Sequence, residues 1–235
     1  MARKASNSMS SRLTRFETIA GWLYLPFYLI ILNLLLQLAN EKLSLGMSAL
    51  TINIAYFAIN LAATLLIFHG FLRQSYFGGS FWNFVPAVVL GFALYYAGTW
   101  VLQFALTKLA PGFTIYNNET VGSLISDNEY IMMAVTIILA PVIEETLVRG
   151  LVFGSIRPTS RVMAYIVSVV LFTLMHNWQY FLLYPAGKVL LSCIPYLPAS
   201  VALAWTYEKA GTIWAPITLH ALINALSFGL LQLNF

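Results

Sequence analysis

Long apolar runs, each bounded by turn or charge signals, are the feature that most restricts how this chain can fold. A run of about 20 apolar residues matches the hydrocarbon thickness of a bilayer when it forms a helix. The runs cover residues 19–39, 47–68, 81–104, 130–156, 162–184, 189–207 and 212–233. Because lipid offers the backbone no hydrogen bonds, runs this long and continuous predict helices. We therefore expect an all-α, polytopic bundle of about seven transmembrane helices.

The composition excludes several other classes of protein. The chain is 60% hydrophobic and 9% charged, whereas a soluble domain has roughly 25% charged residues. The net charge of +4 does not indicate nucleic-acid binding, because the basic residues are scattered at the ends of the runs. The single cysteine, Cys193, can form no internal disulfide and is interpreted as a small buried hydrophobe. We expect the surroundings to be lipid and to include no nucleic acid.

The positions of the basic residues predict the orientation of the helices. If the amino terminus lies in the cytoplasm, eight Lys and Arg residues lie inside and three outside, which satisfies the positive-inside rule. The eight are Arg3, Lys4, Arg12, Arg15, Arg73, Arg157, Arg161 and Lys209, and the three are Lys42, Lys108 and Lys188. We divide the chain into a basic cytoplasmic segment (1–18), accessory helices with an outer loop (19–129) and a core (130–235) that carries the polar residues described next.

Two adjacent glutamates, Glu144 and Glu145, lie inside the fourth apolar run. A single charge at the bilayer centre costs roughly 2.5 to 3.5 kcal/mol on insertion scales, so both carboxylates need partners or a function. Arg149 follows Glu145 by four positions, which predicts an ion pair on one helix face. Glu144 is turned about 100° away and stays free for other partners. A purely structural network is the alternative, but two glutamates exceed what one arginine requires.

Further polar residues occur in two other runs. His176 follows Phe172 by four positions in the fifth run, and His220 and Asn224 share a helix face in the seventh. With a rise of about 1.5 Å per residue, Glu144 and both histidines fall in the middle layer of the bilayer. We expect Glu144, the histidines and Asn224 to converge on one buried cavity.

This combination of side chains indicates hydrolysis. A carboxylate and a histidine can deprotonate a water, while a second histidine and an amide can donate hydrogen bonds to a developing oxyanion. No serine or cysteine stands beside a base in the sequence, which makes a covalent intermediate the weaker hypothesis. Zinc binding stays open, because one glutamate and two histidines match a catalytic zinc site; its ligands would be Glu144, His176 and His220.

Three motifs in this order resemble a known family of membrane proteins. They are Glu144-Glu145-x-x-x-Arg149, Phe172-x-x-x-His176 and His220-x-x-x-Asn224. They are similar to the motifs of the CAAX-protease and bacteriocin-processing family, also called the Abi family, of intramembrane proteases. The resemblance covers roughly residues 131–230.

The resemblance implies roles for these residues. Glu144 would activate the hydrolytic water with help from His176, and His220 with Asn224 would stabilise the oxyanion. The supporting residues would be Glu145, Arg149 and Phe172. We expect no metal cofactor, because an amide at Asn224 suits an oxyanion hole better than a metal shell, and Zn²⁺ is the alternative.

The resemblance also implies a function. We expect an intramembrane endopeptidase of a bacterial plasma membrane that hydrolyses a peptide bond of a membrane-associated peptide or protein, including lipidated or bacteriocin-like ones. The alternative is a non-proteolytic adaptor, immunity or regulatory protein that binds a membrane partner such as a sensor kinase. A transporter also fits buried carboxylates and broken helices, but the sequence has no evident internal repeat.

Overall fold

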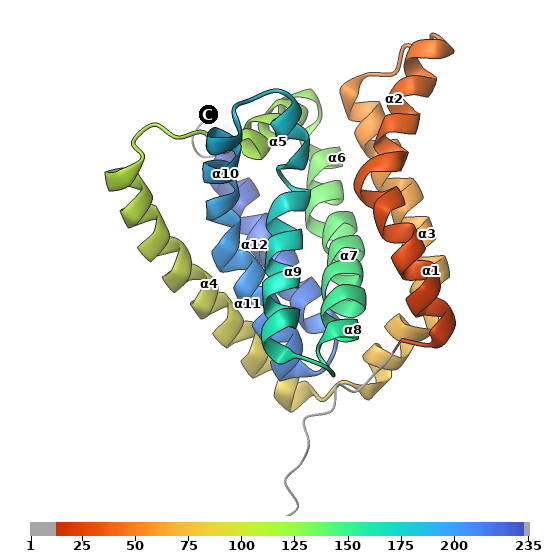
Figure 1. Ribbon diagram of the computed structural model, residues 1–235, viewed down its shortest axis with the longest axis vertical. Coiled ribbons are helices and arrows are strands. Elements are labelled where there is room, and N and C mark those ends of the chain that lie inside the picture. Colours follow the sequence, from red (N-terminus) through yellow and green to blue (C-terminus); the bar gives the residue numbers. More distant parts are fainter. Residues whose placement is uncertain (1–12, 233–235) are drawn as a thin grey trace, which may run out of the picture.

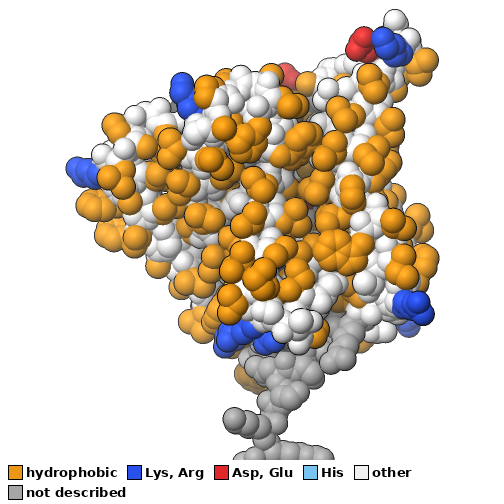
Figure 2. All heavy atoms as spheres, viewed as in Figure 1, with side chains coloured by type: hydrophobic (Ala, Val, Ile, Leu, Met, Phe, Trp, Pro, Cys, Tyr) orange, Lys and Arg blue, Asp and Glu red, His pale blue; other side chains and the backbone are white. Residues whose placement is uncertain are grey.

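The computed structural model describes residues 13–232, and the secondary structure within them is helical (Figure 1). Five helices in this range are long and apolar enough to cross a membrane: Arg15–Lys42, Ala49–Gly78, Phe81–Leu109, Glu129–Ile156 and Ala186–Ala210. On the face shown in Figure 2, hydrophobic side chains cover much of the surface, and Lys and Arg side chains lie toward its edges. The all-α class is confirmed, and the five long apolar helices support a multi-pass membrane protein, whereas seven spans and their orientation stay predictions. Of the basic residues assigned to the cytoplasm, Arg3, Lys4 and Arg12 lie outside the described residues.

The first half of the chain forms three long rods. The first rod consists of α1 (Arg15–Pro26), the π-helix η1 (Phe27–Ile31) and α2 (Leu32–Lys42). It is followed by α3 (Ala49–Gly78) and α4 (Phe81–Leu109). Pro26 ends α1 because proline has no N–H and its ring crowds the preceding turn, and the π-helix follows directly.

A single rod at the centre of the molecule carries both glutamates. It consists of α6 (Glu129–Met133), η2 (Ala134–Leu139), α7 (Ala140–Glu145), η3 (Thr146–Phe153) and α8 (Gly154–Ile156), of which η2 and η3 are π-helical. In its most apolar window 56% of the residues are buried, against 11–44% in the other four long helices. This rod is therefore the one that the others surround.

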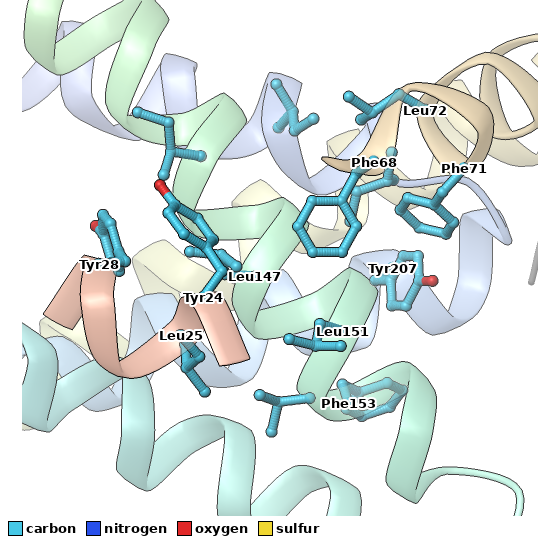
Figure 3. Close-up of a cluster of buried hydrophobic side chains, with 14 of the residues drawn as sticks. Tyr24, Leu25, Tyr28, Phe68, Phe71, Leu72, Leu147, Leu151, Phe153 and Tyr207 are labelled. Carbon is cyan, nitrogen blue, oxygen red and sulfur yellow. The ribbon is translucent and has the colours of Figure 1, made fainter. Parts of the chain in front are cut away.

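The remaining helices enclose the central rod. They are α9 (Arg161–Met175), the 3₁₀ turn η4 (Trp178–Leu182), α10 (Ala186–Cys193), the 3₁₀ turn η5 (Ile194–Tyr196), α11 (Leu197–Ala210) and α12 (Trp214–Gln232). From the other side, Leu25 of α1 and Phe68 and Phe71 of α3 pack into the cluster formed around Leu147 and Leu151 (Figure 3). The hydrophobic core is thus shared between the first half of the chain and the central rod.

Two segments differ from the sequence prediction. The outer loop expected before the fourth apolar run is helical over part of its length, because Leu124 and Ile125 of α5 (Tyr116–Asp127) pack against Met132 and Phe228. The fifth apolar run was expected to be helical over 162–184, but α9 ends at Met175. The Asn177 amide donates back to the Thr173 carbonyl and accepts a bond from Ser192, and these bonds hold the turn that follows α9.

Candidate active site

The ion pair predicted between Glu145 and Arg149 is present and fully buried. Arg149 Nη1 donates to Glu145 Oε1 at 2.9 Å. Arg149 Nη2 donates to the backbone oxygen and to the hydroxyl of Ser200, at 3.0 and 3.1 Å. The guanidinium carbon also lies 4.3 Å from the centre of the Phe172 ring. Arg149 therefore joins the central rod to α11 and α9, and these partners offset much of the cost of burying its charge. Among the described residues, Arg149 Nε and Glu145 Oε2 have no hydrogen-bond partner.

His220 also binds Glu145, which the sequence did not predict. Its Nδ1 lies 2.9 Å from Glu145 Oε1, the same oxygen that binds Arg149. An ionised carboxylate can only accept hydrogen bonds, so Nδ1 carries the proton and Nε2 points toward Glu144. Glu145 is thus shared between Arg149 and His220, whereas the sequence assigned it to Arg149 alone.

Glu144 faces both histidines. Its Oε2 lies 3.6 Å from His176 Nε2 and 4.0 Å from His220 Nε2. The residue is 6% exposed, and Oε2 is buried with no hydrogen-bond donor among the described residues. Its other oxygen, Oε1, lies 3.5 Å from the Tyr28 hydroxyl of η1. A buried acceptor between two imidazoles is costly unless a proton, a water or a ligand joins them.

His176 is held at the end of α9 by its own helix. Its Nδ1 lies 2.8 Å from the Phe172 carbonyl, which can only accept, so Nδ1 is the donor and Nε2 faces Glu144. The ring stacks on Tyr196 with 4.7 Å between the centroids. Phe172 lies between the two histidines, at 4.7 Å from the His176 ring and 5.6 Å from the His220 ring. The Phe172 ring therefore sets the spacing of the imidazoles.

Asn224 is placed differently from the other three candidate residues. Its Nδ2 donates to the Thr136 carbonyl of η2 at 2.7 Å. That carbonyl lacks its helical donors, because the Ala140 N–H bonds to Val135 and residue 141 is a proline. The described part of the chain thus brings Glu144, His176 and His220 together, while Asn224, one turn after His220, bonds to η2.

The candidate zinc ligands are Glu144, His176 and His220. Across residues 13–232, no three His, Cys, Asp or Glu side chains are grouped so that they could hold a metal ion. The zinc alternative stays a prediction, and we assign no catalytic step to a metal.

Sequence reasoning missed three residues around the site. Tyr28 contacts Glu144, Tyr196 stacks on His176, and Ser200 binds Arg149. Each lies within five residues of a proline in an apolar run, namely Pro26, Pro195 or Pro198. A proline in such a run was the available signal, but it does not identify which neighbouring side chain points inward.

Comparison with known proteins adds independent findings. Residues 126–226 match the family model described as type II CAAX prenyl endopeptidase Rce1-like. Over 88 residues the chain is 33% identical to the UPF0177 protein YxdF of Lactococcus lactis subsp. lactis, an alignment that covers 37% of this chain and 42% of that protein. The chain thus spans less than half the length of this curated relative. No solved structure matches the chain.

Proposed function

Because residues 126–226 form a domain of the Rce1-like, type II CAAX prenyl endopeptidase family, we propose that this multi-pass protein is an intramembrane endopeptidase. It hydrolyses a peptide bond of a membrane-associated peptide or protein through a water activated by Glu144 and His176. The observation that carries the proposal is the buried, unpartnered Oε2 of Glu144, which faces the Nε2 atoms of His176 and His220.

The distance between Glu144 and His176 suits a shared water. Glu144 Oε2 and His176 Nε2 are 3.6 Å apart. One water can therefore lie about 2.8 Å from each of them and donate a hydrogen bond to both. Glu144 takes the proton as the water attacks the peptide carbonyl, and His176, whose Nε2 is unprotonated in the neutral ring, holds the water by accepting its second hydrogen. The tetrahedral intermediate then collapses: the C–N bond breaks, and the leaving amine takes the proton from Glu144.

His220 stabilises the oxyanion in its cationic form. Its Nδ1 proton is committed to Glu145, so only a second proton on Nε2 can be donated to the oxyanion. With His220 protonated, the charges of Glu144, Glu145, Arg149 and His220 sum to zero, which makes the burial of all four side chains less costly. Asn224 supplies the second donor through the N–H that does not bind Thr136.

The apolar surroundings of the site also support a substrate class and a membrane location for the protein. A site in the middle of apolar rods takes a peptide that is itself in or anchored to the bilayer, and lipidated or bacteriocin-like peptides have that property. The similarity to a Lactococcus protein supports a bacterial plasma membrane. We propose a peptide or protein as the substrate, and no nucleic-acid partner.

The test is cleavage by the purified protein in detergent. A fluorogenic peptide with a membrane anchor should be cleaved by the wild type, and Glu144→Gln should lower kcat by at least about 100-fold, the lower end of the usual contribution of a general base. Glu129→Gln is the matched control, because Glu129 is an exposed glutamate of the same rod. Equal cleavage by the wild type and Glu144→Gln would refute the assignment.

Two further measurements separate the alternatives. Stoichiometric zinc in the purified protein, together with loss of cleavage on chelation, would establish the metal mechanism in place of the one proposed here. In cells that depend on the protein, full function of both Glu144→Gln and His220→Ala would indicate the adaptor or immunity role.

A further inference from the structure

Within the described residues, the hydrogen bond to the Glu144 carboxylate comes from Tyr28. Tyr28 belongs to η1, which lies about 100 residues before the region that matches the family model. The tyrosine is 4% exposed, so water does not compete strongly for its hydroxyl or for the carboxylate. One of the two oxygens of Glu144 is therefore in contact with a helix outside the family domain.

The π-helix leaves the Tyr28 carbonyl free to accept a hydrogen bond from α3. The Leu32 N–H bonds to the Phe27 carbonyl, one residue further back than in an α-helix, so the Tyr28 carbonyl loses its usual donor. The Tyr56 hydroxyl of α3 donates to that carbonyl at 2.7 Å, and the two tyrosine rings lie 5.8 Å apart. The backbone and the ring of Tyr28 are thus both fixed by α3.

We infer that Tyr28 is a positioning residue for the hydrolytic carboxylate, supplied by the accessory helices. Its hydroxyl holds Oε1 of Glu144 and thereby keeps Oε2 turned toward His176 and His220. The bond of 3.5 Å is long, and catalytic hydrogen bonds commonly tighten when substrate closes the site. The inference rests on the proposed function, since it gives Tyr28 a role through Glu144.

The first test compares two tyrosine-to-phenylalanine variants of the intact protein. Tyr28→Phe should lower kcat on the order of 10-fold, as expected for a lost hydrogen bond to a charged group, with little change in KM. Tyr24→Phe is the matched control, because Tyr24 also bonds from α1 to α3, through Asn60, and does not contact Glu144. The control should keep kcat within about twofold of the wild type.

The second test measures the contact without relying on activity. Thermal midpoints of the wild type, Tyr28→Phe, Glu144→Ala and the double variant form a double-mutant cycle, and non-additive shifts are expected if the two side chains interact. Additive shifts, an unchanged kcat in Tyr28→Phe, or an equal loss in Tyr24→Phe would each overturn the inference. If Glu144→Gln is inactive and Tyr28→Phe fully active, only the inference fails; if Glu144→Gln is fully active, the proposed function fails.

Discussion

Glu144 and Glu145 are adjacent in the chain, but their surroundings differ. Glu145 is fully buried and its Oε1 binds both Arg149 and His220. Glu144 has one long contact to Tyr28, and its Oε2 faces both histidines. Oε2 of either glutamate has no donor among the described residues. Glu145 is therefore held by two basic side chains, whereas Glu144 is held by one long hydrogen bond and faces two histidines.

This difference predicts that the same substitution changes stability by different amounts at the two positions. Glu145→Gln removes the charge that compensates the fully buried Arg149, so the protein should lose about 3 kcal/mol of stability together with activity. Glu144→Gln removes no ion pair to Arg149 and should lower the thermal midpoint much less than Glu145→Gln does, while activity is lost. Thermal unfolding in detergent, measured beside peptide cleavage, checks both outcomes. A large stability loss in Glu144→Gln with none in Glu145→Gln would contradict this division.

Part of the site could be predicted from the sequence at this scale. The spacing of four residues predicts the ion pair of Glu145 and Arg149, because i and i+4 share a helix face. The bond from His220 to Glu145 could not be predicted, since helix spacing says nothing about how separate helices rotate against one another. The catalytic roles given to Glu144, His176, His220 and Asn224 stay predictions.

At the scale of elements, the proline at 141 and the π-helix before it create a place for Asn224. Pro141 has no N–H, and the Ala140 N–H bonds to Val135, so the Thr136 carbonyl is open to the side chain on α12. A proline within an apolar run indicates a disturbed helix. The sequence could not predict that the freed carbonyl would bind Asn224.

This arrangement predicts that Pro141 and Asn224 are coupled. Asn224→Ala leaves the Thr136 carbonyl without its donor and should cost about 1 to 3 kcal/mol of stability. In a Pro141→Ala background the cost should be smaller, because the new N–H at residue 141 can reach that carbonyl in π-helical geometry. Thermal midpoints of the four proteins measure the difference, and an equal cost in both backgrounds would contradict the account.

At the scale of the whole molecule, the apolar runs predicted the long rods but not how they pack. The runs at 47–68 and 81–104 correspond to α3 and α4, which extend beyond them at the carboxyl end. The close approach of α3 to the central rod depends on Gly150, where an added Cβ would lie 2.8 Å from the Phe71 ring. Such a contact is set by tertiary packing and leaves no periodic signal in the sequence. The division at residues 18 and 129 stays a prediction.

The approach at Gly150 predicts an overpacking effect. Gly150→Ala should destabilise the protein by about 1 to 3 kcal/mol, because Phe71 must move. Gly187→Ala is the control, since nothing lies within 4 Å of its added Cβ and a helical alanine is favoured over glycine. Thermal unfolding should show a lower midpoint for the first variant and an unchanged or higher one for the second. Equal midpoints would show that the rods do not meet as described.

The π-helices in the central rod have a consequence for how such chains can diverge. A π turn is an α-helix that has accommodated one inserted residue, and removing that residue restores the α-helix. A deletion within η2 would turn everything that follows by about 100° relative to the start of the rod. The glutamates would then face other helices although their own motif was intact. Homologues of this chain should therefore tolerate insertions in the connections between rods far better than the gain or loss of a single residue between Ala134 and Leu139.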